Sequence, residues 1–193
     1  MTWILIILVL VIAFGPVLWL VPSRRDKRLA ALRSRARSEG LLVDMRRLPK
    51  RDPTAEERVS AGGTIRKPVV ECAAYGRMLA KKLRYLPGFR LRREPAAGAP
   101  DPFADWQYDQ RPAGEGRSHL PAVLSRFEAV LNRLPGDVIA VELDTRSIFL
   151  YWLETPVSTV DSVSELASLL ADLEADLLAL DAGLSPGGST TDS

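Results

Sequence analysis

The stretch DVIAVELDTRSIFLYWL, residues 137 to 153, is the clearest structural signal in this chain of 193 residues. Two runs of strand-forming residues, DVIAVEL and SIFLYWL, flank a short polar segment at residues 144 to 146, and this arrangement predicts a β-hairpin. The second run is apolar on both faces from residue 148 to residue 153. Strands of this kind are covered on both sides, so we expect this strand to lie in the middle of a sheet.

A helix is predicted on each side of the hairpin. Apolar residues recur at helical spacing over residues 120 to 134, between Pro121 in the first turn and the helix-ending Gly136. Residues 162 to 182 carry a heptad seam surrounded by acidic residues, and no basic residue follows Arg146. We expect this second helix to pack on the sheet of its own domain, with contact to a partner helix as the alternative. The seam leucines that a partner would contact are Leu166, Leu170, Leu173, Leu177 and Leu180.

Weaker patterns before the hairpin complete the expected sheet. Residues 40 to 48 and residues 89 to 92 read as strands, and residues 106 to 109 alternate in the same way. Residues 69 to 83 fit either a strand or a helix. Residues 50 to 68 are polar and contain proline and a glycine pair, which predicts a loop.

The N-terminal part of the sequence predicts a membrane anchor. Residues 3 to 21, WILIILVLVIAFGPVLWLV, form a run of nineteen residues without a charge. A helix of this length approaches the ~30 Å hydrocarbon thickness of a bilayer. Because only Met1 and Thr2 precede the run, we expect an uncleaved anchor rather than a signal peptide, and a buried core helix is the rival interpretation.

A basic segment follows the apolar run. Positive charges next to a span mark its cytoplasmic side, so we expect a single-pass protein of the bacterial inner membrane with its N-terminus outside and its C-terminal domain in the cytoplasm. A basic helix here also predicts contact with anionic lipid, although the charges could serve as a topology signal alone. The residues concerned are Arg24, Arg25, Lys27, Arg28, Arg33, Arg35 and Arg37.

Four parts are therefore expected along the chain. Residues 1–22 form a transmembrane anchor, and residues 23–40 form a basic juxtamembrane helix. Residues 41–184 form an α+β cytoplasmic domain, in which a small antiparallel sheet packs with two or three helices. Residues 185–193 form a disordered tail.

Charge divides the chain into two halves. Residues 1 to 100 hold 21 Lys+Arg and 8 Asp+Glu, a net of +13, whereas residues 101 to 193 hold 5 and 16, a net of −11. The simplest partner for the acidic half is the basic half of the same or a neighbouring chain. Nucleic acid is not expected, because the basic cluster lacks interleaved aromatic residues.

No catalytic constellation is recognisable in the sequence. The single histidine, His119, has no nucleophile or acid at a familiar spacing, and the single cysteine, Cys72, lies in an apolar stretch typical of an inert thiol. Neither supports a structural zinc site, and the glycine pairs lack the pattern of a phosphate loop. We therefore expect no enzyme activity, metal or cofactor. The alternative is a small ligand-binding or enzymatic module whose site gathers Asp109, Glu142 and Asp144 with His119.

One stretch resembles a known family. Residues 17 to 43, VLWLVPSRRDKRLAALRSRARSEGLLV, have the layout of the YajC-type accessory subunit of the bacterial Sec preprotein translocase, and SAGGTI, residues 60 to 65, is similar to its glycine pair. Residues 137 to 154 are similar to uncharacterised single-span bacterial membrane proteins labelled as YajC-like. Residues 100 to 193 have no counterpart in the accessory subunit itself. The resemblance implies a link to protein translocation.

These observations together predict an accessory or scaffolding protein. The expected arrangement is a membrane-anchored domain that is presented to a protein partner at the inner membrane. The lipid bilayer and a membrane or cytoplasmic protein are the expected partners.

Overall fold

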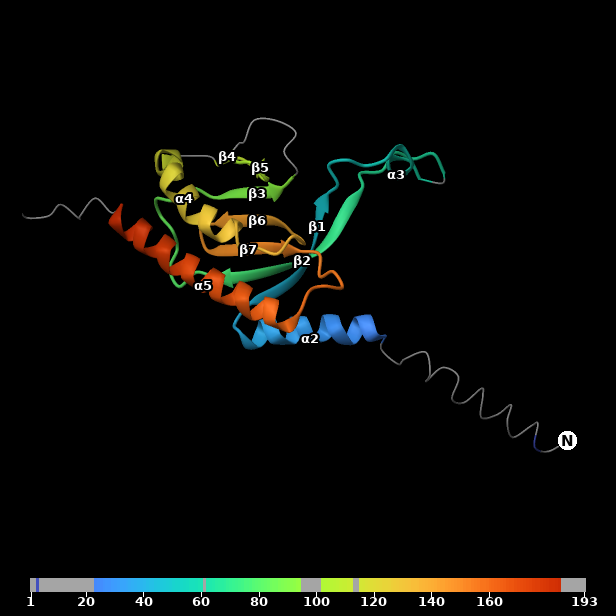
Figure 1. Cartoon of the computed structure of the whole chain (residues 1–193). Helices are drawn as coiled ribbons and strands as arrows, with labels where there is room; N and C mark the ends of the chain where they lie inside the picture. Colours follow the sequence, from blue (N-terminus) through green and yellow to red (C-terminus); the bar gives the residue numbers. More distant parts are fainter. Residues whose placement is uncertain (1–2, 4–22, 61, 95–101, 113–114, 185–193) are drawn as a thin grey trace, which may run out of the picture.

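The computed structural model describes residues 3, 23–60, 62–94, 102–112 and 115–184, which form an α+β fold (Figure 1). The helices are α2 (Arg24–Ser38), α3 (Ala55–Arg58), α4 (Leu120–Leu131) and α5 (Val160–Gly183), and a 3-10 turn, η1 (Glu115–His119), precedes α4. The strands are β1 (Leu42–Pro49), β2 (Val69–Met78), β3 (Phe89–Arg93), β4 (Pro102–Phe103), β5 (Trp106–Gln110), β6 (Val138–Asp144) and β7 (Ser147–Trp152).

All seven strands belong to one antiparallel sheet in the order β1-β2-β7-β6-β3-β5-β4. The expected hairpin is β6 and β7, joined at the pair Asp144↔Ser147. β7 lies between β6 and β2, so the strand that is apolar on both faces is an interior strand, as its sequence predicts. The ambiguous residues 69 to 83 form the long strand β2 and then a segment without regular structure.

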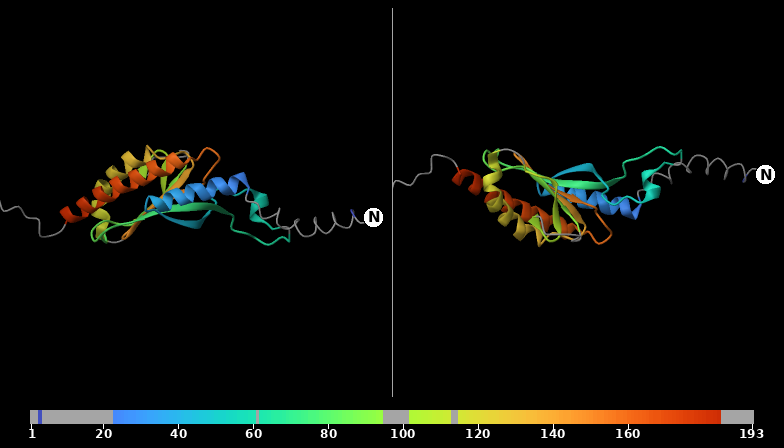
Figure 2. Two further views of the ribbon diagram at one scale, coloured as in Figure 1. Left: turned by 90° about the horizontal axis from the view of Figure 1, so that it is seen from below. Right: turned by 90° about the horizontal axis from the view of Figure 1, so that it is seen from above.

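Helices α2, α4 and α5 cover one face of the sheet (Figure 2). α2 contributes the fully buried Leu32 and Ala36, and α4 contributes Val123 and Phe127. These side chains pack with the apolar residues of β2, β3, β6 and β7 that point to the same side, such as Leu150. Full burial of one such side chain stabilises the fold by about 1.5 to 3 kcal/mol.

α5 begins earlier than its sequence pattern suggests. Thr159 is the N-cap residue, and its hydroxyl accepts a hydrogen bond from the Ser162 backbone N–H at 3.2 Å. A hydroxyl at this position satisfies one of the unpaired N–H groups of the first turn. The helix therefore starts at Val160, ahead of residue 162.

Two acidic residues of α5 face the protein and not the solvent. The carboxylate of Glu174 accepts hydrogen bonds from Arg77 Nε and from the Ala80 backbone N–H. The carboxylate of Asp181 accepts from the backbone N–H groups of residues 84 to 86 at 2.8 to 3.3 Å. Both residues are 8% exposed. α5 thereby fixes the irregular segment between β2 and β3, although its acids were expected to lie outside.

The opposite face of the sheet has a thinner apolar layer. Its buried residues form a small cluster of Leu48, Cys72, Ala74, Ala140 and Tyr151, with Ile139 and Phe149 packed against it. Phe149 lies over Gly76, where an added Cβ would be 2.0 Å from the ring. The guanidinium of Arg46 lies over the same ring at 5.6 Å. Charged side chains, and not a helix, thus cover this face in the described part of the chain.

The described residues between β1 and β2, 50 to 60 and 62 to 68, form an arm that extends beyond the sheet (Figure 1). Its short helix α3 starts at a capping box between Thr54 and Glu57. A turn brings the Gly63 N–H to the Ser60 carbonyl at 2.8 Å, and Gly63 has a φ of 76°, a conformation that favours glycine.

The expectation of a membrane-spanning helix requires correction. In the residues that the structure describes, no helix is both long enough and apolar enough to cross a bilayer. α5 is the longest, but acidic residues recur along it, and α2 is short and basic. The inner-membrane localisation and single-pass topology that the sequence suggested are therefore withdrawn. The apolar run itself, apart from Trp3, and the expected tail at residues 185–193 lie outside the described residues.

Candidate functional site

The structure does not gather the four residues of the predicted ligand or enzyme site. Asp109 and Glu142 come together because both pair with Arg90, at 3.1 Å each. His119 lies at the N-cap position of α4, and Asp144 lies at the end of β6. Among the residues described, no group of three His, Cys, Asp or Glu side chains is arranged to hold a metal ion.

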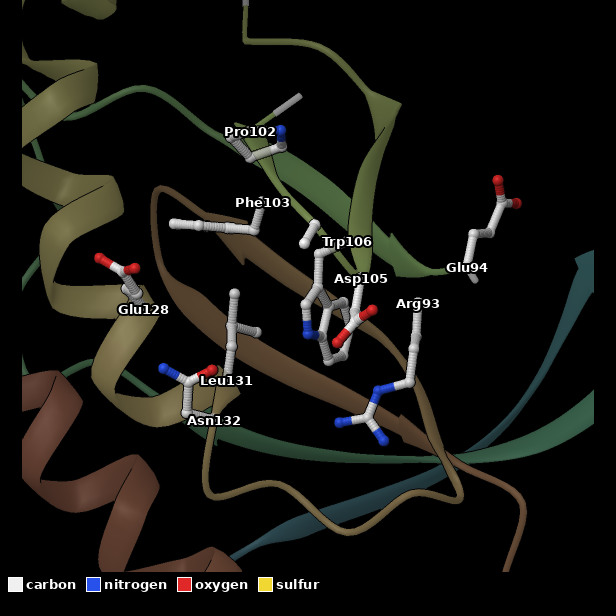
Figure 3. A pocket seen from close by; sticks show the side chains of 10 residues that line it. Arg93, Glu94, Pro102, Phe103, Asp105, Trp106, Glu128, Leu131 and Asn132 are labelled. Atoms are coloured by element: carbon white, nitrogen blue, oxygen red, sulfur yellow. The ribbon is translucent and has the colours of Figure 1, made fainter. Parts of the chain in front are cut away.

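A cavity of about 810 Å³ lies between the β3–β4–β5 edge of the sheet and α4 (Figure 3). The described residues that line it are Arg93, Glu94, Pro102, Phe103, Ala104, Asp105, Trp106, Glu128, Leu131 and Asn132. This set has no histidine, cysteine or serine and shares no member with the four predicted residues. The cavity therefore gives no support to the expected enzymatic alternative.

The one cation lining that cavity has a structural use. Arg93 donates hydrogen bonds to the Pro135 and Leu134 carbonyls at 2.8 and 3.2 Å, just beyond the end of α4. Its guanidinium also lies over the Trp106 ring at 4.8 Å. Burial lowers the pKa of Arg93, because it disfavours the charged form. Arg93 thus joins α4 to β3 and β5.

Three of the basic residues predicted to meet anionic lipid have partners within the protein: Arg28 and Arg33 are partly buried, and Arg35 is exposed. Arg33 binds the Glu154 carboxylate through Nε at 3.0 Å and through Nη2 at 2.5 Å. Arg28 donates to the Glu154 and Thr155 carbonyls, and Arg35 binds Glu39 and Ser164. The others, Arg24, Arg25, Lys27 and Arg37, are exposed. The basic character of α2 therefore serves in part to hold the segment that joins β7 to α5.

The leucine seam of α5 faces the interior. Leu166, Leu170, Leu173 and Leu177 are at most 1% exposed, and Leu180 is partly buried against the same core. These residues fill the space between the helices and the sheet. The helix–helix contact with a partner that the seam could have made is therefore taken by intramolecular packing.

A network of ion pairs joins the open sheet face to the base of the arm. Arg90 binds Glu142, whose carboxylate also accepts a hydrogen bond from the Tyr151 hydroxyl, and Asp109. Asp109 is shared with Arg51 at the start of the arm, at 3.2 Å. Burial opposes the charge of Arg90, but the bonds to the two carboxylates outweigh it and raise its pKa.

Two further contacts hold the arm at its base. Arg51 also pairs with Glu94 at 2.8 Å, and Arg92 donates to the carbonyl of Pro49, the last residue of β1. Within the arm, Lys50 binds Glu57 at 2.6 Å. The arm thus leaves the sheet from a base that is fixed by several partly buried ion pairs, which are stronger than fully exposed ones.

The arm and its two strands carry many of the exposed large apolar side chains of the described chain. They are Leu42, Met45, Val59, Ile65, Val69 and Met78. Val59 and Ile65 face each other in an isolated β-bridge near the arm's tip, and Ile65 is 84% exposed. Leu42, Met45 and Met78 lie on the body of the sheet, whereas Val59 and Ile65 lie on the arm itself. An exposed apolar pair on a projection is typical of a protein-binding surface.

Basic residues surround this apolar tip. Arg58, Arg66 and Lys67 are exposed, and the Arg66 N–H binds the Arg58 carbonyl at 2.7 Å.

Sequence reasoning did not find the arm or its ion pairs. It predicted only that residues 50 to 68 form a loop. The sequence held a partial signal for the ion-pair network: Arg90 and Arg92 alternate with apolar residues, and Glu142 lies in another predicted strand. The order of the strands was needed to see that Arg90 and Glu142 are neighbours.

Comparison of this chain with family models, with characterised proteins and with solved structures finds no match. The resemblance of residues 17 to 43 to the translocase accessory subunit therefore stays a prediction.

Proposed function

We propose that this chain is an accessory or scaffolding protein that presents the tip of its β1–β2 arm to a protein partner. The observation that carries the proposal is the exposed Val59–Ile65 pair on a projection whose base is fixed by ion pairs. An interface gains most of its affinity from a few apolar anchors that enter pockets on the partner. Ile65 is the best placed side chain for such an anchor.

Charge narrows the chemistry of the partner. Arg58, Arg66 and Lys67 lie around the apolar tip. Two acids, Glu56 and Glu57, lie in α3 nearby, and Glu57 is paired with Lys50. Complementary charge mainly increases association rate and selects among partners. We therefore expect an apolar pocket on the partner with an acidic rim.

Site-specific crosslinking tests the proposal. A photo-crosslinking amino acid at position 65 should form an adduct with one protein in cells, and the same probe at position 157 should not. Val157 is a matched control, because it is 80% exposed but lies in the segment between β7 and α5. Because charge mainly affects the association rate, the adduct should form more slowly in the double variant Arg66→Glu, Lys67→Glu.

A second variant separates binding from folding. Ile65→Ser should leave the free energy of unfolding within about 0.5 kcal/mol of the wild-type value, because the side chain is exposed. It should nevertheless abolish binding of the crosslinked protein in a purified system. Equal binding by the wild type and Ile65→Ser would refute a role for the arm tip.

A further inference from the structure

β1 forms one edge of the sheet, and half of its backbone groups point away from β2. Two hydrogen bonds show which backbone groups of β1 point toward β2. The Lys50 N–H donates to the carbonyl of Pro68, the residue just before β2, and the Cys72 thiol of β2 donates to the Arg46 carbonyl. Even-numbered residues of β1 therefore direct their backbone groups toward β2. In an antiparallel pair these directions alternate, so Val43, Met45 and Arg47 direct theirs outward.

The end of β1 limits this outward edge. Pro49 belongs to the outward set but has no N–H to donate, and its carbonyl is taken by Arg92. The open edge is therefore the short segment of residues 43 to 47. Met45 at its centre is 54% exposed, and α2, which packs on α5 and on the start of β1, leaves it uncovered.

The sequence of this segment complements itself when two copies run antiparallel with Met45 opposite Met45. In that register Asp44 of one copy lies opposite Arg46 of the second copy, and Arg46 lies opposite the second Asp44. Within one chain these two residues already pair at 2.7 Å, so the four charges would alternate around a square. Opposite charges facing each other across strands are stabilising.

The neighbouring registers are disfavoured by the same charges. A shift that centres the pair on residue 44 puts Asp44 opposite Asp44, and a shift that centres it on residue 46 puts Arg46 opposite Arg46. Like charges directly opposite are destabilising. Of the registers centred on residues 44, 45 and 46, all of which pair outward-facing residues, only the one centred on residue 45 places opposite charges across from each other.

We infer that two copies of this chain associate through β1 to form a sheet that continues across a two-fold axis at Met45. Each outward-facing pair, Met45 with Met45 and Val43 with Arg47, exchanges two backbone hydrogen bonds. The edge is then no longer open to other strands. This surface is separate from the arm tip, and the antiparallel arrangement directs the two arms to opposite ends of the dimer.

A cysteine at the axis gives the most direct test, made on the full-length chain. In a pair of this kind the two Cα atoms are about 5.5 Å apart, a distance that a disulfide bridges. Met45→Cys should form a covalent dimer under mild oxidation. Arg47→Cys is the matched control, because position 47 faces position 43 and its own copy lies roughly 13 Å away. The native Cys72 is buried and does not compete.

Charge exchange supplies an independent test by sedimentation. Asp44→Arg alone and Arg46→Asp alone should each weaken the dimer at least tenfold, because like charges then face each other twice. An equimolar mixture of the two variants should associate again, since every facing pair is then opposite in sign. Far-UV circular dichroism of each variant checks that it is folded.

The outcomes separate the alternatives. A wild-type protein that stays monomeric at the highest concentration measured overturns the inference. So does a dimer in which Arg47→Cys crosslinks as well as Met45→Cys, or in which the mixture fails to recover. None of these results bears on crosslinking from position 65, so the arm proposal stands or falls separately.

Discussion

At the scale of single residues, Glu154 combines an unusual backbone with many contacts. Its φ of 51° lies in the left-handed region, which costs a non-glycine residue of order 1 kcal/mol or more. The side chain is 5% exposed and accepts hydrogen bonds from Arg33 and from the Tyr75 hydroxyl at 2.7 Å. Burial and the neighbouring carboxylate together raise the pKa of Tyr75. The backbone conformation is held by these contacts.

Replacing Glu154 should therefore destabilise the protein well beyond an ordinary ion-pair loss. Glu154→Gln leaves Arg33 partly buried without its counter-charge, and we expect the free energy of unfolding to fall by about 1.5 to 3 kcal/mol. Urea denaturation measures it. Glu71→Gln breaks the exposed pair with Arg47 and should cost less than about 0.5 kcal/mol. Equal losses would show that Glu154 has no special role.

Asp137 should make stability depend on pH. Burial opposes its charge, but the hydroxyls of Ser158 and Thr155, each 2.7 Å from Oδ2, outweigh burial and lower its pKa. Because the folded pKa lies below the unfolded value of about 3.9, the stabilisation is complete above that value and is lost as the pH falls toward the folded pKa.

The corresponding variant isolates this contribution from those of other carboxyl groups. Asp137→Asn cannot titrate, so it should lose less stability than the wild type when the pH falls from about 5 to about 3. Denaturant midpoints at each pH give the comparison. Parallel pH profiles would exclude Asp137 as a source of the acid sensitivity.

Among the secondary-structure elements, α5 stabilises the fold in two ways, by apolar packing and by hydrogen bonds to a loop. Its leucines fill the core, and Asp181 holds three successive backbone N–H groups of the segment between β2 and β3. Asp181→Ala would leave these groups without an acceptor, so we expect a loss of about 2 to 4 kcal/mol. Asp176→Ala, on the exposed side of the same helix, should change stability by less than about 0.5 kcal/mol. Thermal unfolding of both variants gives the test.

Elements with strong periodicity could be predicted from the sequence. The β6–β7 hairpin and helices α4 and α5 match their patterns, because their buried residues recur at the periods of strands and helices. β4 and α3 were missed, since two and four residues are too short to show a period. Residues 69 to 83 were ambiguous because their first half has strand formers whereas residues 78 to 83 also suit a helical turn. The strand formers belong to β2, and the rest has no regular structure.

The candidate site was less accessible to sequence reasoning. Arg28 and Arg33 look like surface charges, because their acceptors lie more than 120 residues away in sequence. The same holds for Arg51. It follows β1 at one edge of the sheet, whereas its partners Glu94 and Asp109 lie in or next to β3 and β5, near the other edge. The sequence shows that these arginines are charged. The identity of the acidic group that pairs with each arginine depends on the arrangement of strands and helices in the fold.

At the scale of the whole molecule, two irregular segments differ in how they are held. In the segment between β2 and β3, the N–H groups of Leu79 and Leu83 bond to the carbonyls of Arg146 and Thr145, and α5 takes others. The arm is fixed mainly at its base, and its tip is exposed. Exposed loop tips are preferred sites of proteolytic cleavage, whereas a segment bonded on several sides to the folded body resists it.

Trypsin should therefore distinguish two stretches that both contain its target residues. Cleavage after Arg58 and Arg66 should precede cleavage after Lys81, Lys82 and Arg84, which resist until the protein unfolds; Lys67 is not a target because Pro68 follows it. Mass spectrometry of early digests shows the order, and earlier cuts at Lys81 or Lys82 would contradict it. The severed pieces should stay joined, because eight residue pairs tie β1 to β2. An unbroken chain through the arm is thus not needed to hold the folded domain together. An unrelated sequence inserted at the arm tip should therefore leave the domain folded.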